Sequence, residues 1–282
     1  MRFASFEHQG RPTYGLWIDE QTCLEAPRDF LARYPDLKSV IAADALPQLE
    51  HLARQFPQPM SAPRLLPVIP NPGKVFCVGL NYKTHVAEMK RADSDHPAIF
   101  TRFADSLNAH GAPLRKPSST NRFDFEGELA VIIGRAGRRI SQAQAWDHIA
   151  GYACFNDGTA RDWQRHTHQW TPGKNFPGTG PLGPFMATRQ AIGDVNQLTL
   201  ESRLNGQVMQ RASVADLIFT LPVIIEYLSG FTTLSPGDVI ATGTPGGVGD
   251  KREPPVYMNA GDVIEVEITG LGVLKNVVVD AE

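Results

Sequence analysis

The pattern of apolar and polar positions predicts a chain built mostly from short strands. Residues 2–7 and 12–18 alternate like two strands, whereas residues 36–56 carry apolar side chains at helical spacing. From Val75 onward the apolar runs are short, rich in branched residues and separated by Gly and Pro, which is typical of strands. The strands predicted in this part are 75–78, 99–102, 129–133, 149–156, 199–204, 239–242, 263–268 and 272–279.

Helical patterns in the second part of the chain are few, at 84–90, 141–145 and 214–228. Ser213 is a candidate N-cap for the last of these, and Pro222 is expected to kink that helix or to divide it in two. The sequence contains neither a GxGxxG motif nor a P-loop, and strands and helices do not alternate. These features predict a strand-rich α+β fold rather than a doubly wound nucleotide-binding fold.

A proline-rich run at 60–74 marks a boundary. Proline lacks a backbone N–H, so this run is predicted to be neither a helix nor a central strand. We therefore expect a small N-terminal α/β module with its linker at residues 1–70 and a main domain at 71–282.

Composition and charge exclude several classes of protein. The 282 residues carry a net charge of -3 and are 42% hydrophobic, which is ordinary for a globular protein. Neither a basic excess nor a long apolar segment is present, so we expect no nucleic-acid partner and no membrane partner. The three cysteines are widely spaced and predict buried, reduced thiols. With no apolar leader at its start, the chain is expected to be cytoplasmic.

The run FDFEGELAVIIG at 123–134 is the most informative segment. Glu126 and Glu128 precede a short apolar strand at i and i+2, so their side chains point to the same face. Two neighbouring carboxylates repel each other and resist burial, and a divalent cation between them would relieve both effects. The alternative is a solvated strand end with both side chains in water.

Two further acidic positions could belong to the same site. Asp157 ends the strand at 149–156 and could complete an oxygen site suited to Mg²⁺, although a turn or a helix cap is the alternative. His85 and Glu88 lie at i and i+3 of a predicted helix. A carboxylate beside an imidazole fixes its tautomer and raises its basicity, so the pair could take a proton from water. The alternative is a surface pair.

Cationic and polar candidates follow downstream. Arg161 and Gln164 share a face of a short helical turn, where an Arg suits a substrate carboxylate. His166 and His168 are better explained as part of a polar loop than as metal ligands, since no third soft ligand is near. Lys174 falls in the Gly- and Pro-dense segment 171–184, which is predicted to be a loop. It is either solvent-facing or able to stabilise an oxyanion.

Six segments together resemble the fumarylacetoacetate hydrolase superfamily, and in particular its bacterial acylpyruvate hydrolases. They are GLNYKTHVAE, PAIFTR, FDFEGELAVIIG, GYACFNDGTARDWQ, GKNF followed by GPLGP, and TLSPGDVIATGTPGGVG. The resemblance covers about residues 72–282. It implies a mixed β-sheet roll, a homodimer, and a site for Mg²⁺ or Mn²⁺ that Ca²⁺ could occupy in crystals. It also implies a small 2-oxo or 2,4-dioxo acid as substrate.

The resemblance also implies roles for individual residues. The metal ligands would be Glu126, Glu128 and Asp157; the catalytic residues His85, Glu88 and Lys174; and the substrate contacts Arg102, Arg161, Gln164 and Thr244. Two departures from the family pattern bear on the substrate. Arg102 stands where the family commonly has Lys, and Pro177 with Gly178 replaces a polar pair.

The expected reaction is hydrolysis of a C–C bond in an acylpyruvate- or fumarylpyruvate-type acid, which yields pyruvate and a carboxylic acid. His85, oriented by Glu88, would deprotonate a water that adds at C4, and Lys174 and Gln164 would stabilise the oxyanion. The alternatives on the same scaffold are decarboxylation of oxaloacetate, or isomerisation or hydration of dioxo acids in aromatic catabolism. A binding protein without catalysis is the alternative of another class.

Overall fold

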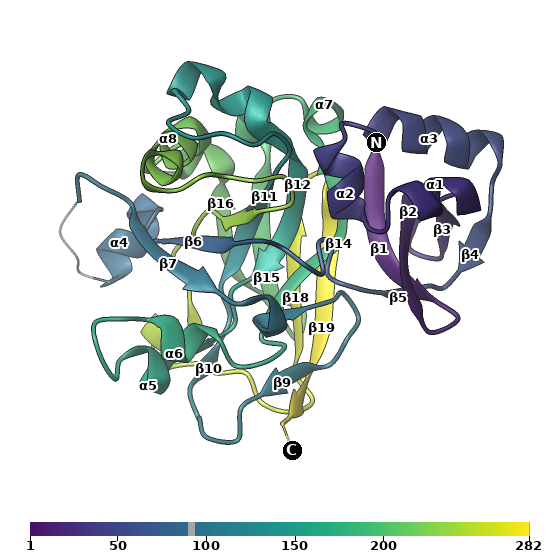
Figure 1. Ribbon diagram of the computed structural model, residues 1–282. Helices are drawn as coiled ribbons and strands as arrows, with labels where there is room; N and C mark the ends of the chain where they lie inside the picture. Colours follow the sequence, from purple (N-terminus) through teal and green to yellow (C-terminus); the bar gives the residue numbers. More distant parts are fainter. Residues whose placement is uncertain (90–93, 282) are drawn as a thin grey trace.

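Strands dominate the structure, a computed structural model that describes all residues except 90–93 and 282 (Figure 1). The strand-rich α+β class predicted from the sequence is confirmed. The helices are α1 (Arg28–Arg33), α2 (Leu37–Ala42), α3 (Leu46–Gln55), α4 (Lys83–Met89), α5 (Arg161–Gln164), α6 (Thr171–Lys174), α7 (Arg189–Ile192) and α8 (Leu221–Phe231). Lys90, the predicted end of one helix, lies outside the described residues.

The strands form a large mixed sheet and two smaller ones. They are β1 (Arg2–His8), β2 (Arg11–Asp19), β3 (Thr22–Glu25), β4 (Pro59–Ser61), β5 (Arg64–Leu65), β6 (Val75–Gly79), β7 (Ala98–Arg102), β8 (Leu107–Asn108), β9 (Leu114–Lys116), β10 (Phe123–Asp124), β11 (Gly127–Ile133), β12 (Ile149–Asn156), β13 (Thr159–Ala160), β14 (Gly180–Thr188), β15 (Thr199–Leu204), β16 (Gln207–Ser213), β17 (Val239–Ala241), β18 (Val263–Ile268) and β19 (Gly272–Asp280). The large sheet has the order β4-β3-β2-β1-β14-β12-β11-β17-β6-β7, and β16-β15-β18-β19-β9 form a second sheet.

β11 is a central strand that is buried on both faces. Leu129, Val131 and Ile133 belong to one hydrophobic cluster, while Ala130 and Ile132 belong to another. This alternation is the period of two expected of a strand. The even-numbered side chains of β11 therefore point to one side of the sheet. The even-numbered residue just before the strand points to the same side.

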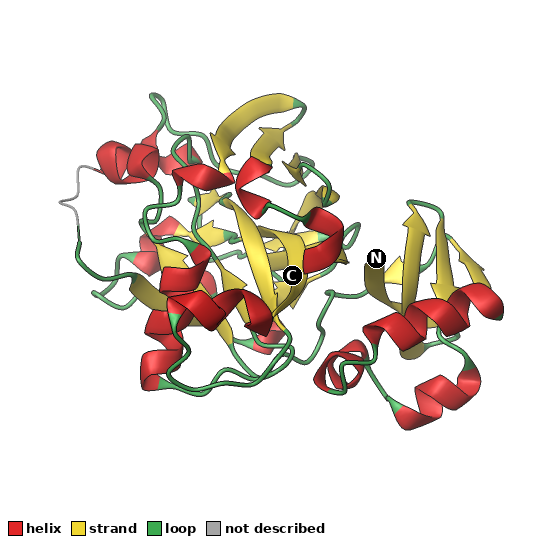
Figure 2. Ribbon diagram, turned by 90° about the horizontal axis from the view of Figure 1, so that it is seen from above, coloured by secondary structure: helices red, strands yellow, loops and turns green. Residues whose placement is uncertain are grey.

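The N-terminal segment extends the large sheet. β1 pairs antiparallel with β14, and the predicted strands 2–7 and 12–18 are present as β1 and β2. The helices α1 to α3 cover these strands, and Figure 2 shows them at the outer end of the molecule. Phe3 and Leu49 share a hydrophobic cluster with Ile132 of the main domain. The boundary near residue 70 therefore stays a proposal, since packing and hydrogen bonding continue across it.

The prediction that 171–184 is a loop is wrong at both ends. Lys174 closes the short helix α6, in which Pro172 occupies the first turn, where a missing N–H is tolerated. Residues 180–184 begin β14, which lies between β12 and β1. Pro184 falls where the pairing with β12 shifts register between Tyr152 and Cys154, so the strand contains a proline without losing a regular ladder bond.

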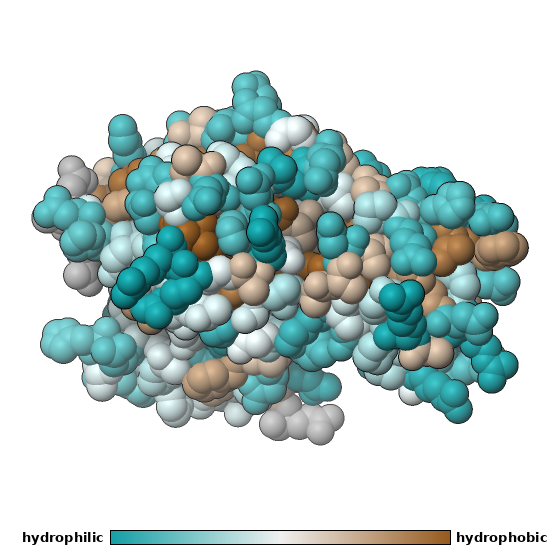
Figure 3. Space-filling model, turned by 45° about the horizontal axis from the view of Figure 1, so that its top comes forward, coloured by the Kyte–Doolittle hydropathy of each residue, from teal (hydrophilic) through white to brown (hydrophobic). Residues whose placement is uncertain are grey.

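Other sequence predictions are confirmed. Pro222 divides the predicted helix 214–228 into a 3₁₀ turn at Val214–Asp216 and α8, and the Ser213 side chain caps the first piece. The three cysteines are buried free thiols. Hydrophilic side chains cover most of the face in Figure 3, with apolar ones scattered among them. None of the helices in the described part of the chain is long and apolar enough to cross a membrane.

Candidate metal and substrate site

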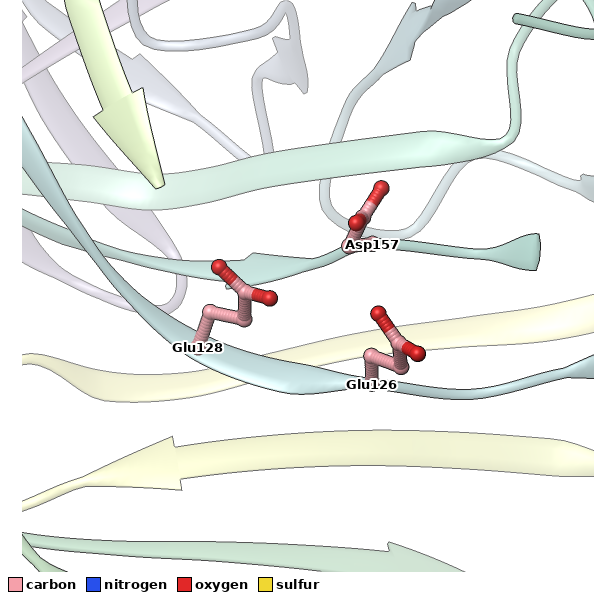
Figure 4. A group of neighbouring side chains, drawn as sticks. All are labelled: Glu126, Glu128 and Asp157. Atoms are coloured by element: carbon pink, nitrogen blue, oxygen red, sulfur yellow. The ribbon is translucent and has the colours of Figure 1, made fainter. Parts of the chain in front are cut away.

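Two neighbouring carboxylates, Glu126 and Glu128, meet a third from a later part of the sequence, Asp157, beside β11 and β12. The two strands are antiparallel with Gly127 opposite Asn156, and the backbone N–H of Asp157 donates to the Glu126 carbonyl at 2.8 Å. Glu126, Glu128 and Asp157 are all buried, and one oxygen of each lies within 4.8 Å of the other two. Figure 4 shows Glu128 on β11 and Glu126 just before this strand, with Asp157 next to them. The side chains predicted as ligands are therefore together; metal binding itself stays a prediction.

Cationic side chains contact two of these carboxylates. Lys174 Nζ donates to Glu126 Oε2 at 2.6 Å and to Asp157 Oδ2 at 2.5 Å. Arg161 Nη2 forms an ion pair with Glu126 Oε1 at 2.6 Å. Burial alone would raise the pKa of Glu126, but the charges of Lys174 and Arg161 outweigh it and lower the pKa to about 2. Glu126 is thus held as an anion.

Glu128 has a different environment. Its Oε2 accepts a hydrogen bond from the backbone N–H of Gly243 at 2.8 Å, and its side chain is 2% exposed. Burial, followed by the negative charges of Asp157 and Glu126, holds the pKa of Glu128 well above its usual value. A buried acid that resists ionisation beside two anions is a position where an added cation is strongly favoured.

A divalent ion with oxygen ligands fits this group of residues. Mg²⁺ and Mn²⁺ prefer carboxylate oxygens, and the site presents three, one of them without a cationic partner of its own among the described residues. The buried charges around it are four carboxylates and three cations, which leave one negative charge when all are ionised. A divalent ion would turn this into a net positive charge, which suits an anionic substrate. The carboxylates are Asp124, Glu126, Glu128 and Asp157, and the cations are Arg102, Arg161 and Lys174.

His85 and Glu88 lie on α4 at the edge of the site. His85 Nδ1 is 3.4 Å from Glu88 Oε2, and His85 is buried although it lies on a surface helix. Glu88 also accepts from the backbone N–H of Gly247 at 3.1 Å, while the N–H of Gly246 donates to Thr84 Oγ1 at 3.2 Å. These contacts hold α4 against the glycine-rich loop. The predicted i, i+3 pairing is therefore present, and the alternative of a surface pair does not describe a buried imidazole.

The sequence did not single out Gln210, which ties the glycine-rich loop to the carboxylate strand. Its Nε2 donates to Thr244 Oγ1 at 2.7 Å, and its Oε1 accepts from the backbone N–H of Gly127 at 2.9 Å. Thr244 in turn donates to the Gly127 carbonyl at 3.0 Å. Gln210 comes from β16 in the second sheet, so nothing local in the sequence connects it with residues 126–128.

Arg102 lies behind the carboxylates, on the side away from the cavity. Its Nη1 donates to Asp157 Oδ1 at 2.5 Å, its Nη2 to Thr179 Oγ1 at 2.7 Å and its Nε to Ser106 Oγ at 3.1 Å. The guanidinium is buried and directed at protein atoms, and Arg102 is not among the residues that line the cavity. This geometry favours a role in positioning Asp157 over the direct substrate contact predicted for Arg102.

Arg161 is held by a carboxylate that the sequence pattern did not bring forward. Asp124 Oδ2 accepts from Arg161 Nε at 2.8 Å, and Asp124 Oδ1 accepts from the backbone N–H of Gly249 at 2.8 Å. Arg161 Nη1 donates to Gln164 Oε1 at 3.1 Å, which places the predicted i, i+3 pair on one face. Asp124 could have been predicted from the sequence, because it lies two residues before Glu126 and continues the alternation of Glu126 and Glu128.

A cavity of about 280 Å³ opens over the carboxylates. Its wall contains most of the predicted catalytic and substrate residues together with apolar and aromatic side chains. The predicted site residues that line it are His85, Glu126, Glu128, Arg161, Gln164, Lys174 and Thr244. A small acid of a few carbon atoms fits a cavity of this size, with anionic groups attracted by Lys174 and Arg161.

Comparison with known proteins gives a consistent result. Oxaloacetate tautomerase fahd2 of Xenopus laevis, described as mitochondrial, is 42% identical over 217 residues, or 76% of this chain and 68% of that protein. A fumarylacetoacetate hydrolase from Exiguobacterium antarcticum is 34% identical with a TM-score of 0.88 over 100% of both chains. Maleylpyruvate hydrolase from Sphingobium sp. SYK-6, in complex with manganese(II) and pyruvate, is 25% identical with a TM-score of 0.83 over 100% of both chains.

The family model described as fumarylacetoacetate (FAA) hydrolase C-terminal matches residues 74–279. This span contains every residue that lines the cavity and all three grouped carboxylates. Together with the relatives above, it confirms the resemblance inferred from the six sequence segments. The chain belongs to the fumarylacetoacetate hydrolase superfamily.

Proposed function

We propose that the protein is a Mg²⁺- or Mn²⁺-dependent enzyme that interconverts the keto and enol forms of oxaloacetate. The observation that carries the proposal is the group of three buried carboxylates, two of which, Glu126 and Glu128, form the floor of a small cavity with cationic walls. A relative that is 42% identical to this chain over 217 residues is named oxaloacetate tautomerase. This proposal revises the reaction expected from the sequence, in which isomerisation was an alternative to C–C hydrolysis.

The chemistry divides between the metal and the side chains. A bound Mg²⁺ or Mn²⁺, held by Glu126, Glu128 and Asp157, would supply Lewis acidity that stabilises negative charge on the oxygen of a 2-oxo acid. Lys174 and Arg161 bind the carboxylate of the substrate by charge-assisted hydrogen bonds. Their existing contacts with Glu126 hold both cations at the cavity wall before the substrate arrives.

The proton at C3 of the substrate needs an acid–base group. His85 lines the cavity, and Glu88 within 3.4 Å of its Nδ1 fixes the tautomer that presents Nε2 as the base. His85 therefore removes a C3 proton from the keto form, and the resulting imidazolium gives a proton to the C2 oxygen, which yields the enol. The same two proton transfers in reverse regenerate the keto form. The hydrogen bonds of Thr84 and Glu88 to the glycine-rich loop keep α4 over the site and limit access of water.

Hydrolysis of an acylpyruvate is the second candidate, favoured by the same His85 and Glu88 pair. In this reaction His85 deprotonates a water that adds at C4, and Lys174 and Gln164 stabilise the oxyanion. The C3–C4 bond then breaks to give a carboxylic acid and the enolate of pyruvate, and the imidazolium of His85 returns its proton to C3 to form pyruvate. The structurally similar maleylpyruvate hydrolase, whose description names manganese(II) and pyruvate, supports this candidate. Decarboxylation of oxaloacetate would need neither a water nor His85 as a base.

One panel of assays separates these reactions. The purified protein is incubated with oxaloacetate, an acylpyruvate and fumarylpyruvate, with Mg²⁺ or Mn²⁺ and with a chelator. Loss of enol absorbance without formation of pyruvate indicates tautomerisation, pyruvate with a carboxylic acid indicates hydrolysis, and pyruvate with CO₂ indicates decarboxylation. The proposal predicts the first result and its abolition by the chelator. No turnover of any of these acids would refute it and support a binding protein.

Substitution of the proposed base tests the assignment directly. His85→Ala should lower turnover at least about 100-fold, since a positioned acid–base group contributes about 10²- to 10⁴-fold. His166→Ala, which removes an exposed imidazole outside the cavity wall, is the matched control. Turnover by His85→Ala near the rate of the control would show that another group moves the proton.

We also propose that the protein is a homodimer, because the resemblance to the fumarylacetoacetate hydrolase superfamily implies one. Light scattering on the full chain at micromolar concentration should then give twice the mass of one chain.

A further inference from the structure

Arg165 is a cation of the cavity that the proposed reaction does not use. It follows α5 directly, one helical turn after Arg161, and it lines the same cavity. Its side chain is 41% exposed, in contrast to the buried Arg161 and Lys174. Arg165 therefore lies at the mouth of the cavity, where an incoming ligand meets the protein.

Asp250 holds the Arg165 guanidinium in place. Arg165 Nη1 donates to Asp250 Oδ1 at 3.3 Å, and Arg165 Nη2 donates to Asp250 Oδ2. These contacts use two of the five guanidinium N–H groups, so within the described part of the chain the group keeps donors for a second carboxylate. The backbone N–H of Asp250 donates to Asp124 Oδ2 at 2.9 Å, which fixes Asp250 to the carboxylate that also holds Arg161.

Asp250 does not depend on Arg165 for its charge balance. Tyr257 Oη donates to Asp250 Oδ1 at 2.8 Å, and Arg122 Nη2 lies 3.5 Å from the same oxygen. The Asp250 side chain is 4% exposed and retains these partners when Arg165 bonds to something else. If Asp250 needed only an ion pair, Arg122 would supply it. Pairing with Asp250 therefore does not by itself explain why Arg165 lies on the cavity wall.

The signs of the charges along the cavity suit a ligand with two anionic ends. The carboxylates that line it, Glu126 and Glu128, are buried at its floor, whereas the exposed lining residues Arg165, Thr167 and His168 are cationic or polar. A metal bound by the carboxylates, together with Lys174, would hold one carboxylate of the substrate at the floor. A second carboxylate then comes to lie near the mouth, where a guanidinium can bind it through two parallel hydrogen bonds.

We propose that Arg165, oriented by Asp250, is the binding group for the distal carboxylate of a dicarboxylic 2-oxo acid. This subsite rests on the proposed function for the orientation of the substrate, and it specifies the class of acid that the cavity selects. Arg165 is a specificity residue rather than a base or a metal ligand. It should therefore act on substrate affinity with little effect on the chemical step.

The test measures binding, so it does not depend on turnover. Affinities of the full-length, Mn²⁺-loaded protein are measured by calorimetry for oxaloacetate and for 2-oxobutanoate, in which a methyl group replaces the distal carboxylate. The wild type should prefer oxaloacetate, and Arg165→Gln should lose about 10- to 100-fold of that preference, as expected for a charge-assisted hydrogen bond. Arg165→Lys should retain part of it, since it keeps the charge but not the bidentate geometry.

Arg122→Gln is the matched control, because Arg122 contacts the same Asp250 oxygen without lining the cavity. It should leave both affinities unchanged. An equal loss for the two ligands in Arg165→Gln, or an unchanged preference, would overturn the subsite. If the preference depends on Arg165 while oxaloacetate is not turned over, the subsite stands and the proposed reaction fails. If oxaloacetate is turned over while the preference is independent of Arg165, the proposed reaction stands and the subsite fails.

Discussion

Glu128→Gln should uncouple the stability of the protein from divalent metals. Glu128 is buried, bonds to the backbone N–H of Gly243, and has a pKa raised well above its usual value. A glutamine keeps the shape and the hydrogen-bond acceptor but removes the charge. Because the folded protein already disfavours the ionised form of Glu128, the metal-free variant should lose less than about 1 kcal/mol of unfolding free energy.

The metal-bound protein should respond very differently. A metal present at 100 times its dissociation constant stabilises the folded state by about 2.7 kcal/mol. Loss of a group that merely orients a ligand weakens metal binding about 10- to 100-fold, so loss of one of three anionic ligands should weaken it at least about 100-fold. At the same metal concentration the variant then retains only about 0.4 kcal/mol of that stabilisation.

Thermal unfolding with and without Mn²⁺ measures both effects. The wild type should gain about 5 °C or more in Tm from the metal, and Glu128→Gln should gain little. Glu50→Gln, a change of a partly exposed acid on the amphipathic helix α3, controls for loss of an acid elsewhere and should keep the full gain. An equal gain in Tm for the wild type and Glu128→Gln would refute the ligand assignment, and so would a large loss of stability in the metal-free variant.

Two substitutions test the positioning of the carboxylates. Arg102→Lys keeps one charge near Asp157 but cannot hydrogen-bond to Ser106 and Thr179 together. It should cost about 2–4 kcal/mol of unfolding free energy, measured in denaturant. It should also weaken Mn²⁺ binding, measured by calorimetry. Unchanged metal affinity with an altered substrate preference would instead restore the substrate contact predicted from the sequence. Gln210→Met leaves the buried backbone N–H of Gly127 without its acceptor and should cost about 3–5 kcal/mol of unfolding free energy. The exposed Gln207→Met on the same strand should cost less than about 0.5 kcal/mol.

The local part of the site could be predicted from the sequence because strand and helix periods are local. The period of two put Glu126 and Glu128 on one face, and the spacing of three joined His85 to Glu88. The same rule would have included Asp124, had the alternation been followed two residues further back. Convergence with Asp157 depends on the pairing of β11 with β12, for which a lone acid at a strand end is only a weak signal.

The non-local part could not be predicted in this way. Gln210 reaches Gly127 only because the second sheet packs against the first, and no spacing in the sequence encodes that contact. β14 was missed because its glycines and prolines signal a turn, whereas the register shift beside Pro184 accommodates them in a central strand. The substrate contact expected of Arg102 came from the family resemblance alone, and the hydrogen bonds of its guanidinium instead direct it to the far side of Asp157.

Anomalous scattering from crystals soaked with Mn²⁺ and oxalate would show whether Glu126, Glu128 and Asp157 share one divalent ion. We expect an anomalous peak among the oxygens of Glu126, Glu128 and Asp157, with oxalate bound on its cavity side. A peak elsewhere, or bound oxalate with Lys174 still the cation between Glu126 and Asp157 and no manganese beside them, would contradict it.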